Sequence, residues 1–184
     1  MTAESALWFP VSADALARAA RIKLALFDVD GVLTDGRLYV DNRGEEYKAF
    51  HSRDGHGLKM LARNGVEIGI ITGRRSQIVE HRARELGIRH VVQGALDKLP
   101  AYEALLAGLG LKTEQTAFMG DDIVDLPIMR RAGLAVACVD AHPRVLGIAH
   151  VVTPSAGGRG AARELCELLM IAQGTHATEM ARYA

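Results

Sequence analysis

The sequence has 184 residues, 49% hydrophobic and 24% charged, which suffices for one sizeable core, so we expect a single domain over residues 1–184. Its 22 Lys and Arg residues balance 22 Asp and Glu residues, and this neutrality gives no reason to expect binding to nucleic acid or to a membrane surface. The first ten residues contain Glu4 and no long apolar run, and no stretch approaches the roughly 20 apolar residues of a membrane helix, so we expect a cytoplasmic protein without a signal peptide.

The first third of the chain predicts a buried strand followed by an unusual insertion. The expected elements are a helix capped by Ser12 and ending near Arg21, a strand over 22–28, a β-hairpin over 37–50, a loop over 51–57 and a helix over 58–64. The apolar run before Asp28 is typical of a strand buried on both faces of a parallel sheet. The hairpin leaves the sheet directly after this strand, so it can overhang the strand's end.

From Val66 onward, strands and helices alternate. The expected strands are 66–71, 90–93, 116–119, 134–139 and 150–153, and the expected helices are 76–86, 99–109, one begun by Pro127, 143–148 and 161–172. A glycine-rich loop and the last helix belong to a C-terminal part over about 155–184, which ends in a polar tail. This alternation predicts an α/β fold, a doubly wound, mostly parallel Rossmann-like sheet with helices on both faces.

Polar side chains follow three of the expected strands. They are Asp28 and Asp30 after the first strand, Thr72 after the second, and Asp121 and Asp122, with Asp125 a helical step further on. Because active sites of open α/β sheets lie beyond the carboxyl ends of the strands, we expect these side chains to meet, together with Lys98 at the start of a helix.

A cluster of carboxylates of this kind needs a cation to offset the repulsion between its negative charges. Two carboxylates about 4 Å apart repel by roughly 4 kcal/mol at an effective dielectric constant of about 20. The ligands would all be oxygen atoms, and the seven histidines show no zinc-like spacing. The sequence therefore predicts a hard cation, and Mg²⁺ suits a site that also binds phosphate.

Four ordered segments resemble the motifs of the haloacid dehalogenase (HAD) phosphatase superfamily. They are residues 28–35 (DVDGVLTD), 72–74 (TGR), Lys98 and 120–125 (GDDIVD), within a match over about residues 22–170. The resemblance implies hydrolysis of a phosphomonoester through an aspartyl-phosphate, with Asp28 as nucleophile and Asp30 as general acid and base. It also implies that Asp28, the backbone carbonyl of Asp30, and Asp121 hold Mg²⁺. Thr72 and Lys98 would then contact the phosphate or the nucleophile, and Asp122 and Asp125 would orient Lys98 or metal-bound waters.

Members of this superfamily usually select substrates with a cap domain. Here neither the segment 31–71 nor the segment 73–97 is long enough for one once its expected strands and helices are formed. An uncapped site must act on a macromolecule or be closed by another subunit.

Further segments resemble the capless branch that hydrolyses 3-deoxy-D-manno-octulosonate (KDO) 8-phosphate in lipopolysaccharide precursor synthesis. They are 48–55 (KAFHSRDG), 140–143 (DAHP) and 157–161 (GGRGA). The resemblance implies a homotetramer whose neighbouring subunits complete each site. The implied substrate-binding residues are His51, Ser52, Arg53, Asp54, Gly55, Lys59, Arg74, Arg82, His90 and Arg159. Arginine side chains suit a bidentate clamp on the sugar carboxylate, and Arg159 could act in a neighbour's site.

Two features of the chain itself also favour assembly. The hairpin offers unpaired strand edges, and the helix 161–172 carries more apolar side chains over 165–171 than one helix face is expected to bury.

Three alternatives remain open. His51 and Lys59 depart from residues common in the capless branch, which leaves the identity of the sugar open. One alternative is a phosphatase for a nine-carbon sialic-type sugar acid 9-phosphate, which would share every catalytic residue. A severed domain of a sugar-nucleotide synthase could keep the fold for assembly alone. A receiver-like phosphoacceptor module also uses Asp, Thr and Lys around Mg²⁺, but it lacks a second Asp two residues after the nucleophile.

Overall fold

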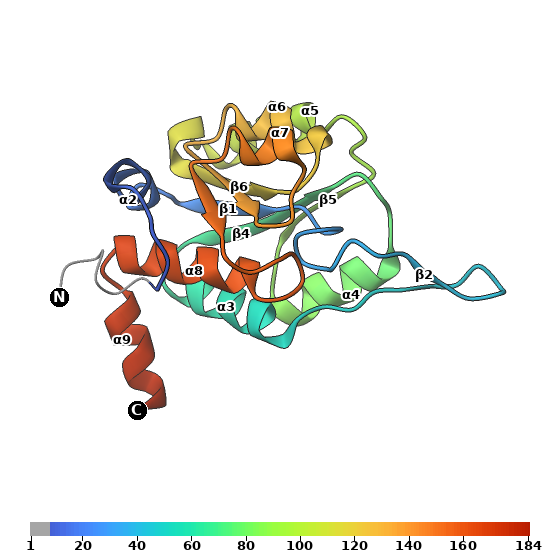
Figure 1. Cartoon of the computed structure of the whole chain (residues 1–184), viewed down its shortest axis with the longest axis horizontal. Helices are drawn as coiled ribbons and strands as arrows, with labels where there is room; N and C mark the ends of the chain where they lie inside the picture. Colours follow the sequence, from blue (N-terminus) through green and yellow to red (C-terminus); the bar gives the residue numbers. More distant parts are fainter. Residues whose placement is uncertain (1–7) are drawn as a thin grey trace.

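The structure of the protein is a computed structural model, which describes residues 8–184. Six strands form its central sheet (Figure 1). The strands are β1 (Leu24–Phe27), β4 (Glu67–Thr72), β5 (His90–Gln93), β6 (Thr116–Gly120), β7 (Leu134–Cys138) and β8 (Val151–Thr153). They lie in the order β5-β4-β1-β6-β7-β8, and all their pairings are parallel, which confirms the predicted fold class. The signal-peptide prediction rests mostly on residues 1–7, which lie outside the described residues.

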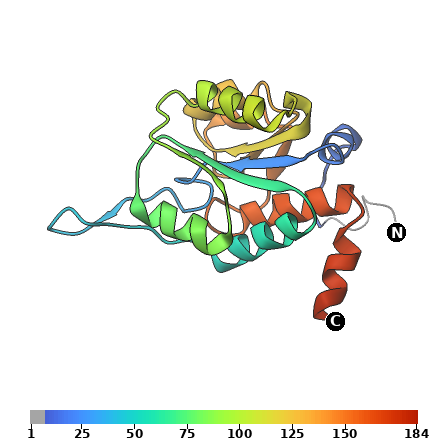
Figure 2. The same cartoon turned by 180° about the vertical axis from the view of Figure 1, so that it is seen from behind.

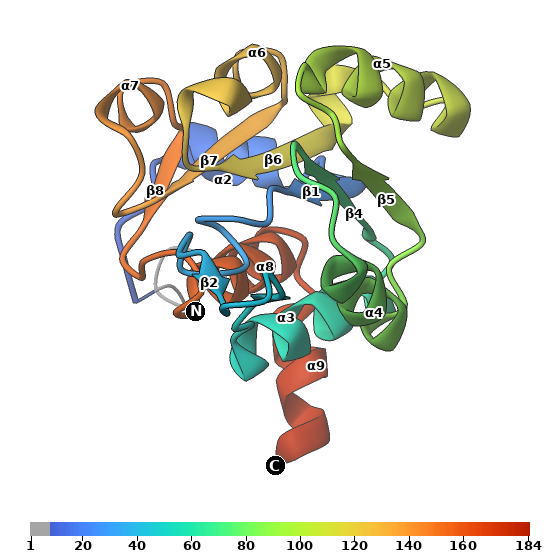
Figure 3. The ribbon, with the colours of Figure 1, turned by 90° about the vertical axis from the view of Figure 1, so that its right-hand side faces the viewer.

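Helices cover both faces of this sheet. They are α2 (Ala13–Ala19), α3 (Ser52–Arg63), α4 (Gln77–Leu86), α5 (Lys98–Leu109), α6 (Leu126–Met129), α7 (Pro143–Leu146), α8 (Ala161–Ala172) and α9 (His176–Met180), with 3₁₀ turns at Thr113–Gln115, Ile123–Asp125 and Ala181–Tyr183. Helices α5, α6 and α7 lie on one side of the sheet, and α3, α4 and α8 lie on the other (Figure 3). No helix within residues 8–184 is both long enough and apolar enough to cross a membrane.

Strand β1 lies at the centre of the fold because both of its faces are apolar and buried. Successive side chains of a strand point to opposite faces, and every side chain of β1 is fully buried. Ala25 and Phe27 pack into the core under α3 and α8, whereas Leu24 and Leu26 pack into the core under α5 and α6. A buried, uniformly apolar strand at the centre of the sheet is therefore what the sequence predicted.

The insertion after β1 is a hairpin, as predicted, but its paired part is short. Strands β2 (Tyr39–Val40) and β3 (Glu46–Tyr47) are antiparallel, and they extend away from the rest of the molecule (Figures 1 and 2). Four large side chains on this arm are 42–59% exposed, namely Leu38, Tyr39, Val40 and Tyr47. The hairpin therefore presents apolar surface that its own subunit does not cover.

The predicted loop over 51–57 is wrong, because helix α3 already begins at Ser52. Gly55 and Gly57 are typical of loops, yet here they allow close packing inside a helix. A Cβ atom on Gly57 would lie 2.6 Å from Cδ and 3.1 Å from Cα of Arg163 in helix α8. Gly57 is thus needed for the tight contact between α3 and α8, and neither glycine ends the helix.

The apolar surface of α8 does not support assembly as expected. All of its side chains from Leu165 to Ile171 are buried within the same subunit, where α2, α3 and α9 pack against this helix. The polar tail is also more ordered than expected, since it forms α9. Glu179 of this helix accepts hydrogen bonds from Arg63 and Asn64 at the end of α3.

Candidate active site

The carboxyl ends of β1, β4 and β6 surround an open cleft of about 360 Å³. Strands β1 and β6 are neighbours in the sheet although they are far apart in the sequence, which makes this the topological switch point where α/β proteins bind ligands. The structure brings together here the residues predicted from the strand ends. The lining includes Asp28, Asp30, Thr72, Arg74, Lys98, Asp121 and Asp122.

The turn after β1 holds its two acids by a close approach of backbone segments. The carboxylate Oδ1 of Asp28 accepts a hydrogen bond of 2.6 Å from the amide of Val29. Gly31 has a φ of 90°, and a Cβ atom there would lie 2.1 Å from Oδ2 of Asp121. A glycine at position 31 therefore lets the acids from β1 and β6 share one site.

The glycine-rich loop before α8 supports this turn from behind. A Cβ atom on Gly157 would lie 1.8 Å from the carbonyl oxygen of Gly31, so no larger residue fits there without a shift of the backbone. The amide of Gly158 donates a hydrogen bond of 2.9 Å to the carbonyl oxygen of Val32. Within its own subunit, this loop thus braces the catalytic turn.

Lys98 links two buried carboxylates. Its Nζ atom lies 2.6 Å from Oδ2 of Asp28 and 2.7 Å from Oδ1 of Asp125. Burial opposes the charge of this ammonium, but Asp28 and Asp125 outweigh burial and raise the pKa of Lys98 above its ordinary value. Lys98 is therefore a fixed positive charge next to Asp28.

Asp125 is fully occupied by hydrogen bonds. Its second oxygen, Oδ2, accepts from the backbone amides of Asp121 at 3.0 Å and Asp122 at 3.3 Å. Asp125 therefore orients Lys98, as expected, and also fixes the loop that carries Asp121. Asp122 itself is exposed, and its carboxylate accepts from the amide of Ile123, so it does not contact Lys98.

The acids fit a hard cation. Oxygen atoms of Asp28, Asp121 and Asp125 lie within 4.8 Å of one another, and Oδ1 of Asp121 is buried without a hydrogen-bond partner. Burial, together with Asp28 and Asp125, raises the pKa of Asp121 to about 8, and burial with Asp125 raises that of Asp28 to about 6. Lys98 lowers the pKa of Asp28 but does not offset the effect of burial. Oδ1 of Asp121 has no partner and is therefore the oxygen most available to Mg²⁺, whereas both oxygens of Asp28 already have partners in Val29 and Lys98 and would be shared with the cation.

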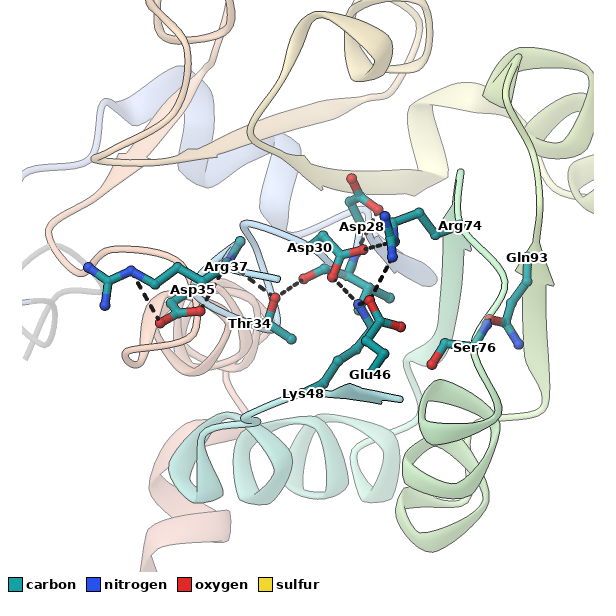
Figure 4. A network of polar contacts seen from close by, with 12 residues as sticks. Asp28, Asp30, Thr34, Asp35, Arg37, Glu46, Lys48, Arg74, Ser76 and Gln93 are labelled. Carbon is teal, nitrogen blue, oxygen red and sulfur yellow. Dashed lines mark hydrogen bonds and ion pairs between the residues drawn. The ribbon is translucent and has the colours of Figure 1, made fainter. Parts of the chain in front are cut away.

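Sequence reasoning missed two residues of the hairpin that reach this site. The Lys48 ammonium donates to Oδ1 of Asp30, and it lies 3.4 Å from Oε1 of Glu46 (Figure 4). On the other side, Nη2 of Arg74 lies 2.7 Å from Glu46, and its Nε lies 3.7 Å from Oδ2 of Asp30. The two-residue spacing of Glu46 and Lys48 was the available signal, because it puts both on one face of a strand.

Several predicted substrate-binding residues lie elsewhere in the subunit. Arg53 and Arg159 line a separate groove beside the start of α8, and His51, Gly55 and Arg82 line a small apolar cavity between α3 and α4. Ser52 and Lys59 line neither of these spaces nor the cleft. Of the ten predicted residues, Arg74 is the one that lines the cleft around Asp28.

Two of these predicted residues have clear local partners. Asp54 is buried, and its carboxylate accepts from the amides of Gly160 at 3.2 Å and Arg163 at 2.8 Å, so it caps helix α8. His90 begins β5, and therefore lies at the end of the sheet opposite the cleft, where its Nε2 is 3.3 Å from Glu67. Neither side chain lines the cleft of its own subunit, and a substrate-binding role for either residue stays a prediction.

Comparisons with known proteins agree with this geometry. The profile of the haloacid dehalogenase-like hydrolases matches residues 87–165. The 3-deoxy-D-manno-octulosonate 8-phosphate phosphatase of Yersinia pestis is 52% identical over 164 residues, which cover 89% of this chain and 88% of that protein. Its crystal structure superimposes with a TM-score of 0.91 at 50% identity and covers 92% of each chain. The corresponding phosphatase of Moraxella catarrhalis, in complex with a magnesium ion, a phosphate ion and KDO, has a TM-score of 0.91 at 39% identity over 93% of this chain and 98% of that one.

The architecture is that of a capless HAD-like hydrolase. Its parallel sheet brings these carboxylates and a lysine together at the switch point, and a hairpin stands in place of a cap. At 52% identity over nearly nine-tenths of its length, the chain belongs to the family of 3-deoxy-D-manno-octulosonate 8-phosphate phosphatases.

Proposed function

We propose that this protein is a magnesium-dependent phosphatase that hydrolyses KDO 8-phosphate to KDO and inorganic phosphate. The observation that carries the proposal is the contact of 2.6 Å between the Lys98 ammonium and the Asp28 carboxylate, at the floor of a cleft that also holds Asp30. Membership in the family supplies the substrate. The neighbouring phosphatase with KDO bound supports the same sugar acid here.

Catalysis begins when a carboxylate oxygen of Asp28 attacks the phosphorus atom in line with the sugar oxygen. The phosphorus–sugar oxygen bond breaks as the new bond forms, and Asp30 gives its proton to the departing alkoxide. In the second half-reaction a water molecule attacks the phosphorus of the aspartyl-phosphate. Asp30 then takes a proton from that water, and Asp28 and phosphate are released.

The other residues of the cleft stabilise the transferring phosphoryl group. Lys98 keeps a positive charge next to the attacking carboxylate, and the Thr72 hydroxyl is available to the phosphate oxygens. The carboxylates of Asp28 and Asp121 and the backbone carbonyl of Asp30 would hold Mg²⁺, which would supply positive charge to neutralise those oxygens. Asp125 holds Lys98 and the Asp121 loop in place for this task.

Substrate selection requires more than one subunit in this proposal. The cleft is open, and among residues 8–184 Arg74 is the one arginine that lines it, although a sugar acid carries a carboxylate far from its phosphate. Arg53 and Arg159 are exposed on the groove beside α8, where they are available to a neighbouring subunit's cleft. The exposed apolar side chains of the hairpin arm supply the surface for such an assembly.

We therefore infer that the working unit is a homotetramer in the cytoplasm and that each chain contributes one domain. Cys138 and Cys166 are free and buried, as suits a reducing compartment. Sedimentation and activity measured over one dilution series test the shared site. We expect activity to fall as the tetramer dissociates, and a monomer with undiminished activity would contradict this part of the proposal.

A phosphate-release screen over sugar-acid phosphates tests the function itself. We expect KDO 8-phosphate to give the highest kcat/KM, with no release in the presence of a chelator. A clear preference for a nine-carbon sugar acid 9-phosphate would correct the substrate. Stable phosphoenzyme without turnover would instead indicate a phosphoacceptor module.

A further inference from the structure

Lys48 is a buried ammonium that the sequence analysis gave no role in the site. It follows strand β3, and its side chain is only 2% exposed. A buried ammonium is costly unless it is paired, and Lys48 has two carboxylates within reach, those of Asp30 and Glu46. The hairpin is thus joined to the turn after β1 by a side chain that is withdrawn from water.

The two oxygens of Asp30 have different surroundings. Oδ1 accepts the hydrogen bond from Lys48, whereas Oδ2 lies 3.7 Å from Nε of Arg74, beyond hydrogen-bond distance. The Arg74 side chain is 50% exposed, in contrast to that of Lys48. Lys48 therefore fixes Oδ1 of Asp30 by a hydrogen bond, whereas Oδ2 has only a longer ion pair with the half-exposed Arg74 (Figure 4).

We propose that Lys48 is a positioning residue for Asp30, which occupies Oδ1 so that Oδ2 is the oxygen that exchanges the proton with the leaving group. This inference rests on the proposed function. Lys48 itself neither gains nor loses a proton: the proton moves from Oδ2 of Asp30 to the sugar oxygen as the phosphorus–oxygen bond breaks. Glu46, held by Arg74, keeps the ammonium of Lys48 from turning away.

Leaving-group chemistry distinguishes this role from a purely structural one. A sugar alkoxide is a poor leaving group that needs the proton from Asp30, whereas 4-nitrophenolate departs with little help from an acid. Loss of the correct Asp30 orientation should therefore slow the release of the sugar and spare the release of nitrophenolate. A general loss of structure would slow both reactions alike.

The experiment compares kcat/KM for KDO 8-phosphate and 4-nitrophenyl phosphate in the wild type and in Lys48→Met, which keeps the chain length but removes the charge and the donor. Because general acid catalysis supplies about 10²–10⁴-fold, we expect a loss of about 100-fold on the sugar phosphate and of less than about fivefold on the aryl phosphate. Lys48→Arg, which keeps a charged donor, should recover most of the loss. Asp30→Asn should give the same pattern as Lys48→Met, with a larger loss on the sugar phosphate.

Lys23→Met is the matched control, because Lys23 is exposed at the opposite end of β1 and should leave both reactions unchanged. If Lys48→Met does not fold, Lys48→Gln, which keeps an uncharged donor, gives the same comparison. Equal losses on the two substrates, or no loss on either, would overturn the role of Lys48. A wild-type protein that releases no phosphate would contradict the proposed function, which separates the two failures.

Discussion

The ammonium of Lys98 lies 2.6 Å from the carboxylate of Asp28, and both side chains are more than nine-tenths buried. This contact joins the end of β1 to the start of α5, so Asp28 and its counter-charge come from residues 70 positions apart in the sequence. Because Lys98 also contacts Asp125, one cation balances two buried anions, and Asp121 is left without such a partner. Asp121, which has no such counter-charge, is therefore the carboxyl that we expect to gain most from a bound Mg²⁺.

Replacement of Lys98 by alanine should destabilise the protein as well as inactivate it. Loss of one partner from a buried ion pair leaves an uncompensated charge, which typically lowers the free energy of unfolding by roughly 3–5 kcal/mol. Urea denaturation without metal measures the effect, with the exposed Lys23→Ala as control. Equal midpoints for the two variants would contradict the pairing described for Lys98.

Asp125→Asn should weaken magnesium binding and activity while it keeps the fold. The amide can still accept from the backbone of the Asp121 loop, but it loses the charge that pairs with Lys98. Residues that orient metal ligands typically contribute about 10–100-fold to metal affinity or activity, and we expect a loss in that range. The neighbouring Asp122→Asn is the matched control, and a similar loss for both variants would contradict the different roles of these two acids.

The metal-free protein should lose stability as the pH rises. Burial first, then the neighbouring carboxylates, raises the pKa of Asp121 to about 8, so the folded state keeps a proton that the unfolded state releases near its ordinary value of 3.8. The proton on Asp121 therefore contributes to the free energy of unfolding. This contribution is fully present below the pKa of 3.8 in the unfolded state, and it is lost as the pH rises through the folded-state pKa of about 8.

Added Mg²⁺ displaces this proton, so its stabilising effect should grow with pH. We expect a larger increase in Tm on addition of Mg²⁺ at about pH 8.5 than at about pH 5.5. The exposed acids with lowered pKa values, such as Asp14 and Asp41, change charge below this window and do not mask the trend. Asp121→Asn should remove most of the difference, and an equal increase at both pH values in the wild type would count against the assignment of Asp121.

Asp54→Ala should lower stability, because Asp54 caps helix α8 from the first turn of α3. Loss of such a cap typically costs about 1–2 kcal/mol of the free energy of unfolding. Asp54→Asn keeps an acceptor oxygen and should lose less, as measured by urea denaturation. Wild-type stability in Asp54→Ala, together with a raised KM, would restore the original hypothesis that Asp54 binds substrate.

The sequence predicts the centre of this site because strand ends obey simple geometry. Asp28, Thr72 and Asp121 each follow an apolar run, and parallel strands bring such positions to one edge of the sheet. Lys98 was expected near these side chains because it begins a helix, but its role came from the resemblance. Its own surroundings in the sequence do not distinguish it from a surface lysine.

The parts that were missed depend on packing between distant segments. Arg53 and Asp54 are adjacent, yet one is exposed and the other caps α8, because residues 52–63 form a helix where glycines suggested a loop. The burial of Lys48 depends on how the hairpin folds back towards Asp30, which no local pattern specifies. The apolar residues of α8 likewise indicate that most of the helix surface is buried, but they do not indicate which elements cover it.

The most direct test of the account is to trap the phosphoenzyme on Asp28. Turnover of KDO 8-phosphate with Mg²⁺ is stopped with acid, the acyl phosphate is reduced with borohydride, and the peptides are analysed by mass spectrometry. We predict conversion of residue 28 to homoserine in the wild type, and neither this product nor phosphate release in Asp28→Asn. Phosphate release from KDO 8-phosphate at a normal rate by Asp28→Asn, or turnover by the wild type without modification at residue 28, would contradict the account.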